Sequence, residues 1–194
     1  LAERGFFEKS HLKTLRKFGS ILQGHPDMKK APGVEMSTGS LGQGLSAAVG
    51  MAMGLKLDNK DAHVFVILGD GECNEGQIWE AAMAAAHYEL GNLIGILDRN
   101  GLQIDGFTKD VMNTEPMIDK WLSFGWHVIE IDAHNFDEIE NAISQAKEVK
   151  NAPVMIVANS VKGKGVSFME NECGWHGKAP SLEEAAKAKS EITR

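Results

Sequence analysis

The sequence predicts an α/β fold in which a doubly wound, mostly parallel sheet is flanked by helices. Four apolar runs of strand length predict strands at 64–68, 93–97, 126–131 and 153–158. Segments with helical spacing separate most of these runs, and this alternation is typical of parallel sheets with right-handed crossovers. The 194 residues suffice for one domain with a sizeable core. We therefore expect a single domain over residues 1–194.

Composition excludes several classes of function. The chain is 43% apolar and 24% charged, as is typical of soluble globular proteins. Its net charge of −7 argues against nucleic acid or an anionic membrane as the main partner. Cys73 and Cys173 are too few for a disulfide scaffold and lack zinc-ligand spacing, and no apolar run is long enough to span a membrane. These features favour the cytoplasm.

The N-terminal quarter predicts a helix, a loop and a second helix. Apolar residues recur with helical spacing over 8–23, and a loop with two prolines and two glycines follows over 24–38. A glycine-rich stretch, Gly39 to Gly44, then opens a helix of small residues over 45–54. Free backbone N–H groups at such a helix start favour anions.

The centre of the chain places two polar groups just beyond two predicted strands. Gly69-Asp70-Gly71 follows the strand at 64–68, and Asn100-Gly101 comes shortly after the strand at 93–97. Ligands of open parallel sheets bind at the carboxyl ends of strands. If the two strands are neighbours, the oxygens of Asp70 and Asn100 converge at one edge. A carboxylate and an amide oxygen suit a hard cation such as Mg²⁺ that holds a phosphate.

The C-terminal half predicts further loops at the same edge. Residues 101–115 are expected to be irregular and to wrap the site. Helices are expected at 116–124 and 135–149, and a capping box formed by Ser181 and Glu184 begins a terminal helix. The strand at 153–158 leads into the loop that carries Lys162, and a later loop carries His176.

Each of these groups also has an ordinary structural interpretation. Asp70 and Asn100 are common turn residues, His25 and His176 could serve only their loops, and Lys162 could lie on a solvated loop. The joint occurrence of two polar turns, each following a buried strand, favours a site. No dinucleotide G-x-G-x-x-G fingerprint and no G-x-x-x-x-G-K-[ST] is present. A metal-anchored diphosphate fits the residues better than NAD or ATP does.

Several motifs in one order resemble the transketolase family. Gly69-Asp70-Gly71 together with the Asn100-Gly101 turn resembles the thiamine diphosphate motif. Five further stretches narrow the resemblance to this family: Gly24-His25-Pro26, Pro32-Gly33-Val34-Glu35, Thr38 to Gly44, Ile104-Asp105-Gly106 and His176-Gly177. The resemblance covers roughly residues 24 to 180. The sequence of these motifs is most similar to that of the separate N-terminal subunit of split transketolases.

The resemblance implies a role for each matching residue. Asp70, Asn100 and the carbonyl of Leu102 would ligate Mg²⁺, or Ca²⁺ or Mn²⁺, and two diphosphate oxygens and water would complete an octahedron. His25 would face the hydroxyls of the donor sugar, and His176 would reach the diphosphate and the reacting centre. The remaining cofactor contacts would come from Gly39, Leu41, Gly69, Gly71, Ile104 and Lys162. Glu75 resembles a glutamate that links two cofactor sites across a subunit interface.

The resemblance also implies a partner. The family transfers a two-carbon ketol unit between sugar phosphates, and a glutamate from another domain activates the cofactor. We expect a separate C-terminal subunit to supply that glutamate in a two-plus-two hetero-oligomer. We also expect the sequence to be truncated at its N-terminus, because the family has a preceding stretch with another active-site histidine and nothing before Leu1 supplies it.

Other functions use the same residues. A deoxyxylulose-phosphate synthase or the E1 subunit of a dehydrogenase would share the metal site formed by Asp70 and Asn100, but His25-Pro26 and the stretch from Gly39 to Gly44 favour transketolase. A non-catalytic binding module that keeps the cofactor pocket is the alternative from another class.

Overall fold

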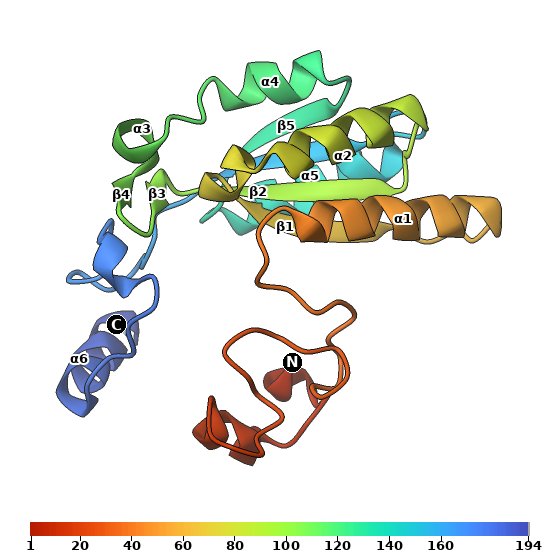
Figure 1. Cartoon of the computed structure of the whole chain (residues 1–194). Coiled ribbons are helices and arrows are strands. Elements are labelled where there is room, and N and C mark those ends of the chain that lie inside the picture. Colours follow the sequence, from red (N-terminus) through yellow and green to blue (C-terminus); the bar gives the residue numbers. More distant parts are fainter. Residues whose placement is uncertain (194) are drawn as a thin grey trace. The chain divides into compact units, whose positions relative to one another are not determined.

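A computed structural model describes residues 1–193, which form two compact units. The first unit comprises Leu1–Gly44, and the second begins at Leu45 (Figure 1). The expectation of one domain over residues 1–194 stays a prediction. None of the helices within residues 1–193 is long and apolar enough to cross a membrane.

The first unit contains two short 3-10 helices, Ala2–Arg4 and Lys9–Thr14, joined by turns and extended segments. The helix predicted over 8–23 is therefore wrong. An amphipathic helix gains most of its stability by burying its apolar face, but Leu12, Leu15 and Phe18 are all at least half exposed. The left-handed backbone of Arg16, with φ of 61°, is also incompatible with a continuous helix.

The second unit is built on four parallel strands in the order β1-β2-β6-β5. These strands are β1 (Val64–Gly69), β2 (Leu93–Arg99), β6 (Val154–Asn159) and β5 (His127–Asp132). All three strand pairs are parallel, so all carboxyl ends lie at one edge. The four predicted strands and their parallel pairing are confirmed.

Helices cover both faces of this sheet, which confirms the doubly wound class. On one face, α1 (Gln43–Leu57), α2 (Gly76–His87) and α4 (Met117–Ser123) share a core with β1, β2 and β6. On the other face, α5 (Phe136–Glu148) packs on a second cluster. Alternation in β2 explains the division, because Leu93 and Leu97 enter the first cluster while Ile94 enters the second.

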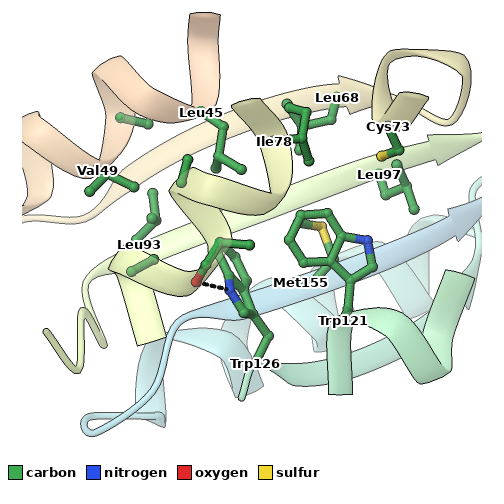
Figure 2. Close-up of a cluster of buried hydrophobic side chains, with 14 of the residues drawn as sticks. Leu45, Val49, Leu68, Cys73, Ile78, Leu93, Leu97, Trp121, Trp126 and Met155 are labelled. Atoms are coloured by element: carbon green, nitrogen blue, oxygen red, sulfur yellow. Dashed lines mark hydrogen bonds between the residues drawn. The ribbon is translucent and has the colours of Figure 1, made fainter. Parts of the chain in front are cut away.

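Figure 2 shows the larger core, where α1 and α2 lie over the sheet. The small residues of α1 allow this helix to pack closely, as Ala52 and Leu45 are fully buried. Trp126 anchors the end of the cluster, because its indole N–H donates to the carbonyl oxygen of Ala82 at 3.0 Å. This bond joins the chain just before β5 to the middle of α2.

The α5 face of the sheet is less completely covered. A groove of about 300 Å³ runs there between sheet and helix, lined by Asp98 and by apolar side chains that include Ile96, Ile139 and Ile143. At the edge strand β1, Phe65 is 46% exposed and Ile67 is 72% exposed. The two faces therefore differ in how much apolar surface the described helices bury.

The second unit also contains smaller elements, among them a 3-10 helix over Gly71–Asn74 directly after β1. Residues expected to be irregular contain a hairpin of β3 (Leu102–Gln103) and β4 (Gly106–Phe107), followed by a single helical turn, α3 (Thr108–Val111), so that expectation is only partly correct. Near the C-terminus, α6 (Leu182–Ile192) begins with the predicted capping box of Ser181 and Glu184. The Glu184 pKa is lowered because its carboxylate accepts the Ser181 backbone N–H.

Candidate functional site at the carboxyl ends of β1, β2 and β6

The site is centred on the carboxylate of Asp70, which the end of β1 positions. Its Oδ1 accepts a hydrogen bond from the Gly71 backbone N–H at 2.8 Å, and its Oδ2 accepts one from the Gly101 N–H at 2.7 Å. The strand register explains why Asp70 reaches Gly101. Gly69 of β1 pairs with Asp98 of β2, and the chain turns after each of these strands at the same edge of the sheet. The turns that carry Asp70 and Asn100-Gly101 therefore meet at this edge, whereas the convergence of the Asp70 and Asn100 side-chain oxygens stays a prediction.

Asp70 is a buried acid that no ion pair among residues 1–193 neutralises. Asp70 is only 3% exposed. No ion pair within residues 1–193 includes its carboxylate. Burial raises the Asp70 pKa and the nearby Asp98 adds to this, while the bonds from Gly101 and Gly71 oppose it. A buried carboxylate in this condition is stabilised by a bound cation.

Asn100 is held in one orientation by two neighbours. Its Nδ2 donates to Asp98 Oδ2 at 3.0 Å, and its Oδ1 accepts the Leu102 backbone N–H at 2.9 Å. The side-chain oxygen therefore lies on the side of Asn100 away from the Asp98 carboxylate. Asn100 and Leu102 flank Gly101, whose φ of 72° bends the chain between them.

The side-chain oxygens of Asp70 and Asn100 suit a divalent cation that a bound phosphate would also coordinate. Residues 1–193 contain no group of three His, Cys, Asp or Glu side chains able to hold a metal. Asp70 has lone pairs left after its two hydrogen bonds, and Asn100 Oδ1 has one. The residues could thus hold a hard cation through one carboxylate, one amide oxygen and the Leu102 carbonyl. Oxygens of a bound phosphate would complete the coordination.

Gly71 follows Asp70 directly, and the side chain of Gln103 packs against Gly71. A Cβ placed on Gly71 would come within 3.0 Å of Gln103 Cβ, so glycine allows the β3 side chain to lie against this turn. Gln103 Nε2 is buried and has no hydrogen-bond partner within residues 1–193. The sequence interpretation missed Gln103, because a two-residue hairpin strand carries no periodic signal. The Gly71 N–H, which the resemblance assigns to a diphosphate, binds Asp70 here.

His25, Gly39 and Leu41 belong to the first compact unit. Gly39 has a φ of 121°, and a Cβ there would lie 2.5 Å from His25 Cγ. The imidazole ring therefore lies directly against the Gly39 backbone, and Leu41 is half exposed. The structure brings His25 and Gly39 together although thirteen residues lie between them in the sequence.

The other predicted site residues lie on loops and turns of the second unit. Ile104 is 65% exposed at the tip of the β3–β4 hairpin. Lys162 follows β6 in the loop expected at this edge, and its carbonyl oxygen accepts the Asn171 N–H at 2.9 Å. His176 is exposed at the end of a 3-10 turn, Cys173–Trp175, and Glu75 is exposed at the start of α2.

Comparison with known proteins gives a consistent result. The profile described as "Transketolase, thiamine diphosphate binding domain" matches residues 5–193. The chain is 49% identical over 176 residues to the 6-deoxy-6-sulfo-D-fructose transketolase subunit SqwG of Clostridium sp. (strain MSTE9), with 91% of this chain and 64% of that protein covered. It is 44% identical to an apulose-4-phosphate transketolase subunit of Phocaeicola vulgatus, with 100% and 68% covered.

Solved structures extend the similarity to the fold. The crystal structure of transketolase from Campylobacter jejuni superposes with a TM-score of 0.89 at 33% identity, covering 95% of this chain and 30% of that chain. The sedoheptulose-7-phosphate complex of the Pichia stipitis transketolase gives a TM-score of 0.88 at 34% identity, covering 95% and 29%. The chain thus spans about two thirds of the subunit-type relatives and under a third of these longer proteins.

Proposed function

The chain belongs to the transketolase family, as its thiamine diphosphate-binding domain, and on this premise we propose that the site binds the diphosphate of that cofactor through a divalent cation. Asp70, Asn100 and the Leu102 carbonyl are the protein ligands of this cation, which is Mg²⁺, Mn²⁺ or Ca²⁺. The observation that carries the proposal is the 2.7 Å bond between the Asp70 carboxylate and Gly101, which brings the two halves of the motif together.

The proposed reaction is the transfer of a two-carbon ketol unit from a ketose phosphate to an aldose phosphate. Bound thiamine diphosphate supplies the carbanion chemistry for cleaving and forming the carbon–carbon bond. The chain's own residues hold the diphosphate and handle protons. His25 and His176 are the proposed proton carriers, because an imidazole can gain or lose a proton near neutral pH.

Other residues are proposed to shape the binding site. Gly69 and Gly71 leave room for the diphosphate beside Asp70, and Lys162 adds a cation near it. Gly39, Leu41 and Ile104 line the cofactor. Each of these assignments rests on the match to the motif order. The close packing of Gly71 against Gln103 is a separate, structural reason for a small residue at this position.

Activity is proposed to require a separate C-terminal subunit that supplies the glutamate needed to activate the cofactor. The names of the relatives support this, because both the Clostridium and the Phocaeicola proteins are named as transketolase subunits. We propose a two-plus-two hetero-oligomer in the cytoplasm. The two free cysteines, Cys73 and Cys173, are compatible with a reducing compartment.

The cation site is tested by ligand-induced stabilisation. A mixture of Mg²⁺ and thiamine diphosphate should raise the melting temperature in a concentration-dependent way, by an amount that follows RT ln(1 + [L]/Kd). Asp70→Asn should abolish the rise. Asp61→Asn is the matched control, because Asp61 is exposed beside the amino end of β1 and should leave the rise unchanged. A rise of equal size in Asp70→Asn would contradict the proposal.

The reaction is tested by reconstitution. Purified chain mixed with a candidate C-terminal subunit, Mg²⁺ and thiamine diphosphate is assayed with xylulose 5-phosphate as donor and ribose 5-phosphate as acceptor. Turnover is expected from the mixture and not from either of the two chains by itself. If the mixture binds the cofactor but turns over none of a panel of ketose phosphates, the proposed activity is refuted and the chain is a cofactor-binding module.

A further inference from the structure

Beyond the proposed cation ligands, we propose that Asp98 and Ser160 are positioning residues that fix the orientation of the Asn100 carboxamide. Asp98 lies at the end of β2 and Ser160 directly follows β6. Neither residue is a ligand in the proposed site. Their role is to ensure that Asn100 presents its oxygen, and not its NH₂ group, to the cation.

The problem that they solve is chemical. The two ends of a carboxamide have nearly the same shape, but one end is an acceptor and the other carries two donors. Only the oxygen can bind a cation. A flipped Asn100 would direct N–H groups at the cation and repel it. The side chain therefore needs neighbours that distinguish its two ends.

The structure provides one such neighbour on each side. An ionised Asp98 only accepts hydrogen bonds, and its Oδ2 receives Asn100 Nδ2 at 3.0 Å. The Leu102 backbone N–H only donates, and it binds Asn100 Oδ1 at 2.9 Å. A flip of the amide would place donor against donor and acceptor against acceptor, so both bonds would be lost together.

Ser160 keeps Asp98 in place. Its Oγ contacts the other oxygen of the Asp98 carboxylate, Oδ1, in a short hydrogen bond. The Ser160 backbone N–H also donates to the carbonyl oxygen of Arg99 at 3.2 Å. The parallel register of β2 and β6, with Arg99 opposite Asn159, brings Ser160 to this position. The Asp98 carboxylate is thus fixed by one bond on each oxygen.

The arrangement parallels metal sites in which a carboxylate orients a histidine ligand. Removal of such outer partners typically costs 10- to 100-fold in metal affinity. The inference rests on the proposed function, because it assigns the oriented oxygen to a cation. The orientation itself is a property of the chain without any ligand, and it can be measured separately.

The test uses the full 194-residue chain and two measurements. Mn²⁺ affinity in the presence of thiamine diphosphate is measured by electron paramagnetic resonance. Hydrogen exchange of the Asn100 side-chain amide protons is measured by NMR without metal, after assignment through loss of the signal in Asn100→Asp. The variants are Asp98→Ala, Asp98→Asn, Ser160→Ala and, as control, Asp132→Ala. Asp132 is an exposed acid at the end of β5, so its removal tests loss of charge alone at this edge.

Asp98→Ala should weaken Mn²⁺ binding about 10- to 100-fold and speed exchange of the Asn100 amide protons. Ser160→Ala should change both quantities in the same direction by less. Asp98→Asn should stay close to the unchanged protein in both, because an amide oxygen still accepts from Asn100 while its NH₂ group can donate to Ser160. Asp132→Ala should alter neither quantity.

Two results would overturn the inference. If Asp98→Asn loses as much affinity as Asp98→Ala, the charge of Asp98 and not its orienting bond is what matters. If the Asn100 amide protons exchange equally fast in the unchanged protein and in Asp98→Ala, the amide is not held. Failure of the unchanged protein to bind Mn²⁺, with slow exchange intact, would instead refute the proposed function and leave the orientation standing. Melting temperatures of all variants show whether each is folded.

Discussion

Trp121 and Trp126 pack against each other with ring centroids 4.9 Å apart, yet they differ in the fate of their indole N–H groups. Trp126 Nε1 donates to the Ala82 carbonyl at 3.0 Å, whereas Trp121 Nε1 is buried and has no hydrogen-bond partner among residues 1–193. Two tryptophans in one cluster thus form a natural matched pair for measuring one buried hydrogen bond.

We expect Trp126→Phe to lower the free energy of unfolding more than Trp121→Phe does. Both changes remove similar volume from fully or nearly fully buried positions. Only the first also removes a hydrogen bond, whose net contribution is about 1 kcal/mol. Urea unfolding of both variants measures the difference. Equal loss of stability in the two variants would contradict this explanation.

The metal-induced stabilisation should grow with pH. Burial raises the Asp70 pKa above its ordinary value of 3.8, and a protonated carboxyl cannot ligate a cation. The rise in melting temperature caused by Mg²⁺ and thiamine diphosphate should therefore be small below the raised pKa and full above it. Thermal unfolding over a series of pH values, with and without both ligands, measures this dependence.

The same group should have the opposite effect in the metal-free protein. Because the folded-state pKa exceeds the unfolded value, the folded state binds more protons between the two values. The contribution of Asp70 to the free energy of unfolding is thus present below pH 3.8 and falls as pH rises through the folded-state pKa. The metal-free Asp70→Asn protein should lack this component, and an unchanged pH profile would contradict the assignment.

Gly39→Ala should disrupt the loop around His25. The φ of 121° is unfavourable for alanine, and the new Cβ would lie 2.5 Å from His25 Cγ. We expect faster tryptic cleavage at Lys29 and Lys30, which are exposed in this loop. Gly50→Ala is the matched control. Gly50 lies in α1, and a Cβ added there would have no neighbouring atom within 4 Å. Alanine is more favourable than glycine in a helix by up to about 1 kcal/mol.

Thiol reagents should discriminate between the two cysteines. Cys73 is 3% exposed, and burial raises the pKa of its thiol to about 12. Cys173 is partly exposed. Since the thiolate is the reactive form, iodoacetamide at mildly alkaline pH should label Cys173 in the folded protein and Cys73 only after unfolding. Mass spectrometry of the digested protein locates the label, and early labelling of Cys73 would contradict its burial.

The sequence predicts the sheet well because β1, β2 and β6 are apolar runs of strand length, and β2 and β6 are buried along most of their length. It also predicts the meeting of Asp70 with the Asn100-Gly101 turn, since neighbouring parallel strands end at one edge. The helix over 8–23 was wrongly predicted, because spacing alone does not reveal whether a surface exists to bury Leu12 and Phe18. Helical spacing of apolar residues indicates that a helix could have an apolar face. It does not indicate whether another part of the molecule covers that face.

The supporting contacts of the site could not be predicted. Asp98 and Ser160 are 62 residues apart, and only the insertion of β6 beside β2 brings them together. The position of Gln103, whose Nε2 has no hydrogen-bond partner within residues 1–193, depends on a hairpin whose strands have two residues each. These contacts follow from tertiary register, which no local window of sequence contains.

The strand order has a consequence for synthesis on the ribosome. β6 lies between β2 and β5 in the sheet, although it is the last of the four strands to be made. A nascent chain that ends before Val154 must therefore leave the backbone N–H and C=O groups of β2 and β5 unpaired on the side that β6 will occupy, and it lacks the serine that holds Asp98. Such open edges attract other strands. The edges of β2 and β5 that pair with β6 in the complete sheet therefore stay open between the synthesis of β5 and that of β6.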